Sequence, residues 1–232
     1  MIYGIDNYDK LRVLRPVWDT HECDSMKMPI VKAFPEEQFD FERLRFLNIQ
    51  NISSKKSAKG CVAICFNYDN RLEKFWNDPL KYIPKLQKAA ICCTPDYSIY
   101  PSMNYWQIAH NTFKNRWLGC LWQDYGITVI STISWANPDT YDICFSGVEQ
   151  GSIVAISTLG CTDTSIDAFL NGYNNMMKRI KPSLVIVFGE FIEGLYGRLL
   201  IVKYEESFNN SSVDLQPTLF DIPKVIEITE AC

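Results

Sequence analysis

Short apolar runs separated by helical stretches constrain the fold of this chain more than any other feature of its sequence. From Gly60 onward, these runs are rich in β-branched and other apolar residues, which is typical of strands buried on both faces. Strands that alternate with helices are typical of right-handed βαβ units and a parallel sheet. Five runs are strong and the last is weaker: 61–68, 89–93, 127–133, 153–157, 184–188 and 198–204.

The sequence therefore predicts an α/β fold with a mainly parallel sheet of about five to six strands and flanking helices. Because a complete eightfold barrel needs more strands, we expect an open sheet or an incomplete β/α barrel.

Prolines and capping signals divide the segments between these strands. Pro79 interrupts the helical stretch after the first strand, and Pro84 is expected to shorten the helix that follows. A second helix is expected over 102–118. A third is expected to start at Thr164, which begins a capping-box pattern, and to end at Pro182.

Two parts of the chain depart from this alternation. The segment 136–151 is turn-rich and offers no long helix, so the parallel order of the sheet is expected to break there. Residues 1–59 carry no clean periodicity and hold one short helical pattern at 36–46. We expect residues 1–59 to form an irregular N-terminal extension packed on the core, and residues 60–232 to form a single α/β domain.

The composition is that of an ordinary globular protein. Hydrophobic residues make up 47% of the chain, charged residues 22%, and the formal net charge is −4. An acidic chain is poorly suited to neutralising phosphates, so its charge argues against nucleic acid as a partner. No apolar run approaches the roughly 18 residues that a membrane span needs, so we expect no membrane association and a cytoplasmic location.

The nine cysteines show no disulfide or zinc-binding pattern. Their number is odd, no Cys-x-x-Cys pair occurs, and the chain has only two histidines. We therefore expect free thiols, several of them packed within strands as small hydrophobes, and no metal site. The sequence does not identify a cofactor.

Polar residues, one aromatic residue and two glycines follow the expected strands at the point where each strand ends. In parallel α/β proteins the carboxyl ends of the strands meet at one edge, where ligand sites form. These residues either converge on one crevice or are the ordinary polar residues of loops. The set is Asp69, Thr94, Asp96, Ser134, Trp135, Thr158, Gly160, Gly189 and Glu190.

Three carboxylates of this set are candidate catalytic groups, and the other six residues are candidate ligand-binding groups. Asp69, Asp96 and Glu190 could supply a general acid and base, or oxygen ligands for Mg²⁺. Asp96 is equally explained as a turn residue whose side chain bonds its own backbone.

The turn 158–165 is the most suggestive ligand-binding segment. It is rich in small and hydroxyl residues and leads into a helix N-terminus, which can bind a phosphate through free N–H groups. Plain helix capping by Thr164 explains the same residues, and Asp163 would oppose an anion. The chain has no Walker sequence and no Gly-x-Gly-x-x-Gly run.

Several stretches carry a family resemblance. The most specific is Thr-Pro-Asp-Tyr-Ser-Ile-Tyr at 94–100, followed by Trp106-Gln107. The others lie at 76–79, 126–135, 144–147, 152–160, 172–173, 181–183 and 187–189. Over about residues 60–190 the chain resembles the bacterial and phage family known as domain of unknown function 4417, although Ser131 stands where that family usually has proline. The resemblance implies a bacterial, phage or mobile-element origin and no particular activity.

Three functions remain open. The first is a site at the strand ends for a small-molecule or phosphate-bearing ligand, in an enzyme or in a binding domain. The second is a phage or mobile-element effector that binds and inhibits a host protein, as anti-defence proteins do. The 13% aromatic content and the negative net charge are compatible with this function. The third is a replication- or DNA-associated accessory protein, which the implied origin alone suggests.

Overall fold

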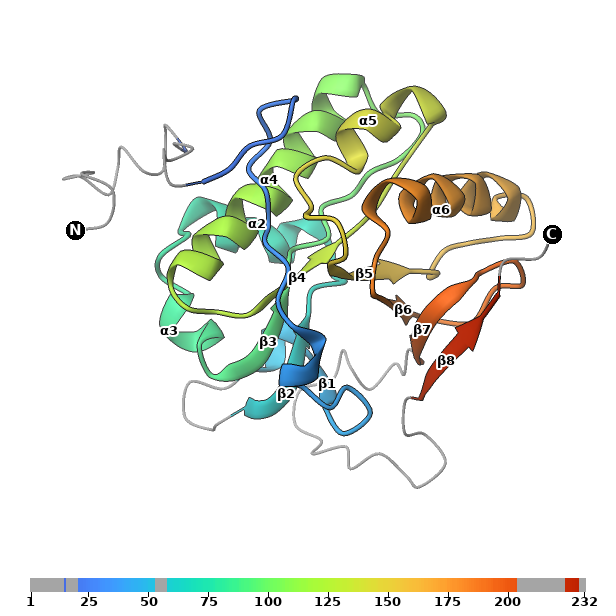
Figure 1. Ribbon diagram of the computed structural model, residues 1–232. Helices are drawn as coiled ribbons and strands as arrows, with labels where there is room; N and C mark the ends of the chain where they lie inside the picture. The colour runs from blue at the N-terminus through green and yellow to red at the C-terminus, as the bar shows by residue number, and fades with distance from the viewer. Residues whose placement is uncertain (1–14, 16–20, 53–57, 204–223, 230–232) are drawn as a thin grey trace.

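An eight-stranded sheet, whose strands follow one another in chain order, forms the centre of the part of the protein that the structure describes (Figure 1). This computed structural model describes residues 15, 21–52, 58–203 and 224–229. Residue 204, where the sixth expected strand ends, and the polar tail after it up to residue 223 lie outside these ranges. The strands are β1 (Arg45–Asn48), β2 (Ala58–Ile64), β3 (Ala89–Cys93), β4 (Val129–Thr132), β5 (Ile153–Ser157), β6 (Leu184–Phe188), β7 (Gly197–Val202) and β8 (Val225–Ile228).

The sheet is parallel from β1 to β7, and β8 runs antiparallel to β7. The predicted α/β fold with helices flanking the sheet is confirmed. The predicted number of strands is wrong, because β1 and β8 add a strand at each edge, and the antiparallel β8 makes the sheet mixed. Each of these strands has four residues and exposed positions, so neither carries the apolar run of a buried strand.

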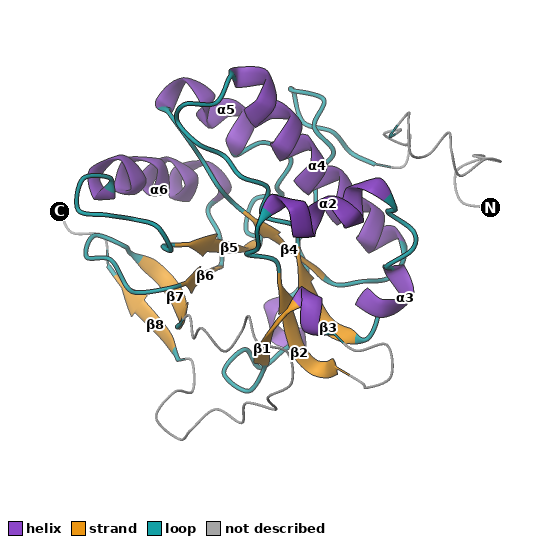
Figure 2. Cartoon of the chain, turned by 180° about the vertical axis from the view of Figure 1, so that it is seen from behind, coloured by secondary structure: helices purple, strands orange, loops and turns teal. Residues whose placement is uncertain are grey.

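The α-helices all lie on one face of the sheet (Figure 2). Parallel strands in chain order are joined by crossovers, and crossovers of a constant hand place every helix on the same side. Among the described residues, no helix combines the length and the apolar character needed to cross a membrane. The helices are α2 (Asp69–Asn77), α3 (Ile83–Leu86), α4 (Tyr105–Asp124), α5 (Tyr141–Cys144) and α6 (Ile166–Ile180), with short 3-10 helices η1 (Glu36–Gln38), η2 (Ile49–Asn51) and η3 (Pro138–Thr140).

The sheet is strongly curled, although it remains open between its edges. Phe66 follows β2 and Phe188 ends β6, yet their rings stack with centroids 5.0 Å apart and planes 11° apart. In a flat sheet, strands four positions apart would lie about 19 Å from each other. The two rings can meet only because the sheet bends round on itself, which matches the expected open sheet or incomplete barrel.

The inner face of this curl is a continuous apolar core. It is formed by alternate residues of six consecutive strands, as expected where successive side chains point to opposite faces. Its buried strand residues are Val62, Ile64, Ile91, Cys93, Ile130, Ile153, Ala155, Leu184, Ile186, Phe188, Leu200 and Val202.

Three phenylalanines of the N-terminal part cover this inner core. Phe34, Phe39 and Phe41 form an edge-to-face ladder with centroid separations of 5.7 and 6.3 Å, and all three pack on the inner cluster. The helix predicted over 36–46 is therefore wrong: only η1 is helical there. The apolar spacing that suggested a helix instead serves to place aromatic rings over the sheet.

Ion pairs and hydrogen bonds fix this covering segment to the far edge of the sheet. Arg198 on β7 binds both carboxylate oxygens of Glu36 at 2.8 and 2.9 Å, and Glu42 accepts a hydrogen bond from the N–H of Val225 on β8 at 3.0 Å. The segment thus spans the opening between β1 and β8. The expected irregular extension also contains β1 and the first two residues of β2, while the domain boundary at residue 60 stays a prediction.

The outer face is buried by the helices. Leu72 on α2 and Leu86 on α3 pack with α4 over one half of the sheet, and Tyr173 and Met176 on α6 cover the other half. Strands covered on both faces need continuous apolar runs. This explains why β3, β5 and β6 begin and end at the predicted residues.

The helix predictions were partly right. Pro84 lies in a helix of only four residues, as expected, and α6 ends before Pro182. Helix α4 begins three residues later than predicted, at the Asn104 capping box, and continues to Asp124. The predicted cap at Thr164 is wrong, because Ser165 occupies the N-cap position and makes no side-chain cap bond. The segment 136–151 has only short helices, yet β4 and β5 remain parallel, so the predicted break in order is also wrong.

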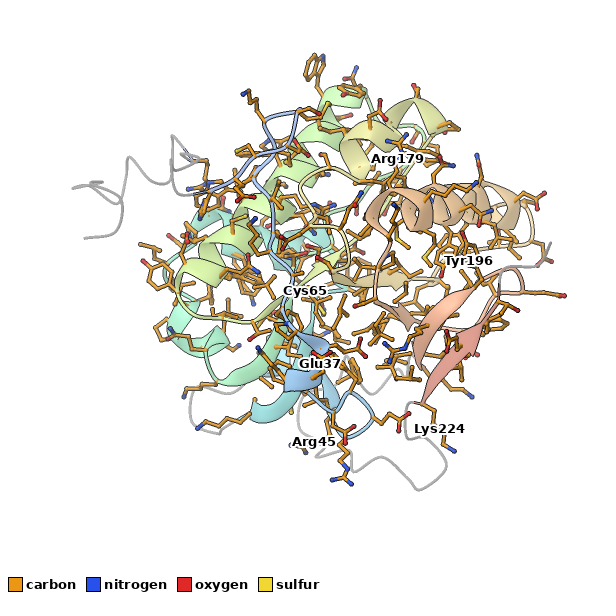
Figure 3. All side chains as sticks on the ribbon, viewed as in Figure 1. Glu37, Arg45, Cys65, Arg179, Tyr196 and Lys224 are labelled. Carbon is orange, nitrogen blue, oxygen red and sulfur yellow. The ribbon has the colours of Figure 1, made fainter. Side chains whose placement is uncertain are left out.

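The eight cysteines that the structure describes are all free. Six are buried, and Cys65 lies in the middle of the molecule (Figure 3). Burial raises the pKa of the Cys65 thiol, and it raises the pKa of Cys93 to about 12. These thiols are neutral and pack as small apolar side chains, as the sequence predicted.

Candidate functional site

The residues that follow the carboxyl ends of the strands fall into two groups. One group follows β2, β3 and β4, and its polar members include Asp69, Asp96 and Ser134. The other follows β5 and β6 and includes Thr158 and Glu190. Because β2 to β6 are parallel, all of these ends lie at the same edge of the sheet.

A carboxyl held between strand ends is the centre of the first group. The Ser134 hydroxyl, two residues beyond β4, donates a 2.5 Å hydrogen bond to Asp96 Oδ1. The backbone N–H of Asp96 faces the carbonyl of Cys65, just past β2, at 3.4 Å. Asp96 is partly buried, so three neighbouring strand ends position a carboxyl that keeps some access to solvent.

The surroundings of Asp96 disfavour its charged form. Burial is the main cause and raises the pKa of Asp96 to about 6; the nearby charge of Asp69 adds to this, and the Ser134 hydrogen bond acts in the opposite direction. At neutral pH the group is mainly a carboxylate that accepts a proton easily. A carboxyl in this range can act as a general acid or base.

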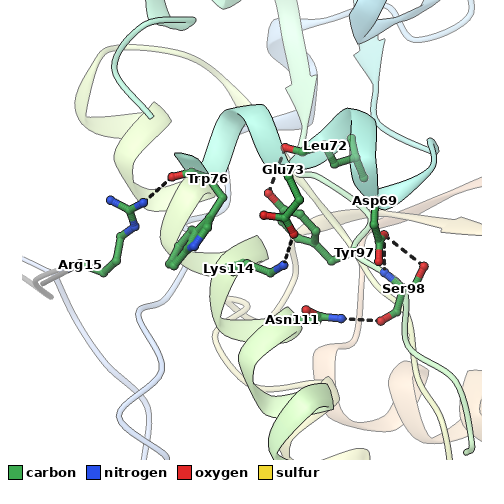
Figure 4. A network of polar contacts seen from close by, with 9 residues as sticks. All are labelled: Arg15, Asp69, Leu72, Glu73, Trp76, Tyr97, Ser98, Asn111 and Lys114. Atoms are coloured by element: carbon green, nitrogen blue, oxygen red, sulfur yellow. Dashed lines mark hydrogen bonds and ion pairs between the residues drawn. The ribbon is translucent and has the colours of Figure 1, made fainter. Parts of the chain in front are cut away.

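Asp69 supports the turn that carries Asp96. Its Oδ1 accepts hydrogen bonds from the Ser98 N–H at 3.0 Å and the Ser98 hydroxyl at 3.1 Å, and Asn111 on α4 donates to the Ser98 carbonyl at 2.7 Å (Figure 4). Asp69 is also the first residue of α2, where a negative charge is favourable. These hydrogen bonds therefore fix the turn 96–98.

The hollow beside Asp96 is small. It has a volume of about 10 Å³, which is room for about one water molecule. A ligand larger than water would therefore meet Asp96 at its solvent side. The lining includes Asp96, Asn111, Arg116, Ser134 and Cys144.

Thr94, predicted to bind a ligand, is fully buried instead. Its hydroxyl donates to Asn115 Oδ1 and accepts from the Thr132 N–H, both at 2.8 Å. The Thr132 hydroxyl in turn donates to the Thr94 carbonyl at 2.7 Å. Thr94 therefore ties the ends of β3 and β4 to α4 below the surface on which Asp96 lies.

Arg116 on α4 is the main residue of this region that the sequence reasoning missed. Its side chain is buried, and it donates to the carbonyls of Thr132 at 3.1 Å, Cys144 at 2.9 Å and Ser146 at 2.9 Å. Burial lowers the pKa of Arg116 to about 10, which leaves it charged at neutral pH. The signal was a charged residue placed directly before the apolar run 117–122 of the same helix.

The second group forms a separate small unit. The Thr158 hydroxyl donates to the Glu190 carbonyl at 2.8 Å. Gly189 has φ +125°, and a Cβ there would lie 2.4 Å from the Thr158 hydroxyl oxygen, so this position requires glycine. The Glu190 residue itself is exposed. These three predicted residues are brought together, although at different strand ends from Asp96.

Trp135 packs on α6 and not beside Asp96. Its ring lies against Gly172, where a Cβ would be 2.0 Å from the Trp135 indole nitrogen, and its centroid is 5.0 Å from that of Phe169. These are packing contacts, and the role of Trp135 in ligand binding stays a prediction.

The turn 158–165 bonds largely within itself. The Thr162 N–H donates to the Ser165 hydroxyl at 2.8 Å, and the hydroxyls of Thr162 and Thr164 are 3.0 Å apart. Gly160 is exposed with φ +83° and has open space around it. These internal bonds favour a turn that organises the start of α6 over a phosphate site.

A larger hollow of about 280 Å³ lies between the N-terminal part and the C-terminal half of α4. A hydrogen bond between His21 and Asp124 at 2.9 Å and an ion pair between Lys32 and Glu22 at 2.6 Å line it. Burial raises the pKa of the lining Cys120 thiol to about 12. Across the described ranges, no three His, Cys, Asp or Glu residues are grouped to hold a metal ion.

Comparison of the sequence with known proteins identifies a family and two relatives. The profile described as "Domain of unknown function (DUF4417)" matches residues 27–205. The chain is 34% identical over 155 residues to the "Gene 1 protein" of Mycobacterium phage D29, covering 66% of this chain and 53% of that protein. It is 35% identical over 137 residues to the "Gene 1 protein" of Mycobacterium phage L5, covering 58% of this chain and 60% of that protein.

The chain thus spans little more than half the length of these phage relatives. No solved structure matches it.

Proposed function

Because this chain belongs to the DUF4417 family, whose description assigns no activity, we propose its function from its own site: it binds a small molecule at the carboxyl ends of β3 and β4 through Asp96 and Ser134. The observation that carries the proposal is the Asp96 carboxyl, partly buried and shifted to a pKa of about 6. An ionised carboxyl in such surroundings lowers the stability of the folded state at neutral pH. Groups with pKa values shifted in this way are concentrated at functional sites.

The chemistry of the site indicates the kind of ligand. Asp96 offers an oxygen that accepts a hydrogen bond and can exchange a proton, and Ser134 fixes its orientation at 2.5 Å. A ligand bearing a hydroxyl or amine donor fits this arrangement. The internally bonded turn 158–165 gives less support to a phosphate-bearing ligand. We propose that this chemistry takes place in the cytoplasm, with which the eight free cysteines of the described residues are compatible.

Native mass spectrometry of the protein purified gently from its own host tests the proposal. We expect a small-molecule mass on the wild type that is lost from Asp96→Asn and Ser134→Ala. Asp163→Asn, the same change at an exposed aspartate, is the matched control and should keep the mass. If the wild type and Asp96→Asn carry the same adducts, or neither carries any, the proposal is wrong.

A second candidate function, binding and inhibition of a host protein, is favoured by a separate observation. Of the eight exposed large apolar side chains among the described residues, six lie in segments that follow strand carboxyl ends, and two of them, Tyr68 and Trp106, are each 76% exposed. Exposed aromatic residues of this kind often anchor protein partners. The six are Tyr68, Tyr100, Tyr105, Trp106, Leu159 and Phe191.

The same purification separates the two candidates. A host protein retained by the wild type and by Asp96→Asn, but lost from Trp106→Ser, would support the second function. Retention of the small molecule by Trp106→Ser, with no host protein on the wild type, would support the first.

A further inference from the structure

An arginine from the N-terminal part of the chain is inserted between two helices. Arg15 is 8% exposed. Its guanidinium carbon lies 4.2 Å from the ring centroid of Trp76 and 5.1 Å from that of Trp117. The guanidinium also donates a hydrogen bond to the Trp76 carbonyl (Figure 4). A planar cation is thus held by two aromatic rings and a backbone oxygen.

The aromatic wall that receives Arg15 is fixed by its own neighbours. Trp76 on α2 makes edge-to-face contacts with three rings of α4, at centroid separations of 5.6 to 6.2 Å. Such contacts hold the indole in a single orientation. The cradle therefore does not depend on Arg15 for the position of its rings. The three rings are His110, Phe113 and Trp117.

The charges beside the cradle are already balanced. Lys114, 6% exposed at its side chain, pairs with Glu73 at 2.7 Å, and its ammonium lies 3.9 Å from the Tyr97 ring centroid. Burial, and then the charge of Lys114, lower the pKa of His110. His110 is therefore neutral at pH 7, and its ring does not repel a guanidinium group.

The backbone of Arg15 has an unusual conformation. Its φ is +45°, a region that residues with a side chain rarely adopt. Such a conformation persists where surrounding contacts stabilise it. The contacts of Arg15 include those of its guanidinium with Trp76 and Trp117.

We propose that Trp76 and Trp117 form a guanidinium-binding site, that Arg15 of the same chain is its occupant, and that this site holds Arg15 against α2 and α4. Recognition rests on the flat, delocalised shape of the group: it stacks on an indole face and donates in its own plane to the Trp76 carbonyl. An ammonium has neither property, so lysine cannot replace arginine here. The proposal is independent of any ligand at Asp96.

Chemical rescue of Arg15→Ala in the full chain tests the site. Removing the side chain should lower Tm by about 3–8 °C, because a buried cation–π contact and a charged hydrogen bond are lost. Propylguanidinium at millimolar concentration should restore part of this loss in a saturable manner, because a ligand that binds only the folded state stabilises it. Propylammonium should not, and neither compound should raise the Tm of the wild type.

Two further variants keep the test decisive. Arg15→Lys retains the charge and lacks the planar group, so it should also melt below the wild type, and it gives the same comparison if Arg15→Ala does not fold. Arg71→Ala removes an exposed arginine of α2, the helix that carries Trp76. This variant should show no rescue. The proposal is overturned if Arg15→Ala and Arg15→Lys melt at the wild-type Tm, or if propylguanidinium and propylammonium shift the variants equally.

Discussion

Replacing the carboxyl of Asp96 with an amide is expected to stabilise the protein at neutral pH. Burial raises the pKa of Asp96 from its ordinary value of 3.8 to about 6, and one pKa step corresponds to about 1.4 kcal/mol. The full difference is therefore about 3 kcal/mol against the ionised form. Because the side chain keeps some exposure to solvent, we expect a gain of about 1–3 kcal/mol for Asp96→Asn at pH 7.5.

The sign of the pH dependence follows from proton binding. Between about pH 4 and 6 the folded protein holds a proton on Asp96 that the unfolded chain has released, so this group makes stability fall as pH rises through that window. Its stabilising contribution is complete below the unfolded pKa and is lost above about pH 6. The difference between Asp96→Asn and the wild type should therefore be small at pH 4 and largest above pH 6.

Urea unfolding of both proteins from pH 4 to pH 8 measures this difference, and effects of other groups cancel in it. Asp163→Asn is the control, and its difference from the wild type should change little over the same range. A variant Asp96→Asn that is less stable than the wild type at pH 7.5, or a difference that does not vary with pH, would refute the reasoning.

Three other substitutions probe the packing and the polar contacts around the site by urea unfolding. Gly172→Ala should destabilise by about 1–3 kcal/mol despite the better helix propensity of alanine, because its Cβ would lie 2.0 Å from Trp135; an unchanged midpoint would contradict this. Arg116→Lys should lose about 2–4 kcal/mol, since one ammonium cannot reach the three carbonyls that the guanidinium binds, and a neutral effect would show that those bonds matter little. Phe188→Ala should lose about 3–5 kcal/mol with its stack on Phe66, and a loss below about 1 kcal/mol would argue against the curl that brings the two rings together.

The strands whose bounds could be predicted are mostly buried and almost wholly apolar. The segments 89–93, 153–157 and 184–188 lie between helices on one face and the inner core on the other, so almost every residue is apolar. Strands β1 and β8 lie at the edges, where exposed positions interrupt the apolar pattern. Their pairing depends on the curl of the whole sheet, which no local pattern encodes.

The site could be predicted only as a set of strand ends. The positions of Asp96 and Ser134 after adjacent strands were enough to expect them close together, and their atoms are 2.5 Å apart. The orientation of Trp135 could not be predicted, because it depends on the missing side chain of Gly172, on a helix 37 residues away in the chain. Arg116 was missed for a similar reason, since its partners are backbone carbonyls that carry no sequence signal.

The central claim is that the Asp96 carboxyl at the strand ends has a pKa raised toward neutral pH. The titration of this group tests the claim most directly. The side-chain carboxyl ¹³C resonance of Asp96, assigned with Asp96→Asn, can be followed by NMR from pH 3 to pH 9. We predict a pKa of about 6, falling in Asp69→Asn, where a neighbouring negative charge is removed. A titration near the ordinary aspartate value of about 4, unaffected by Asp69→Asn, would contradict the account.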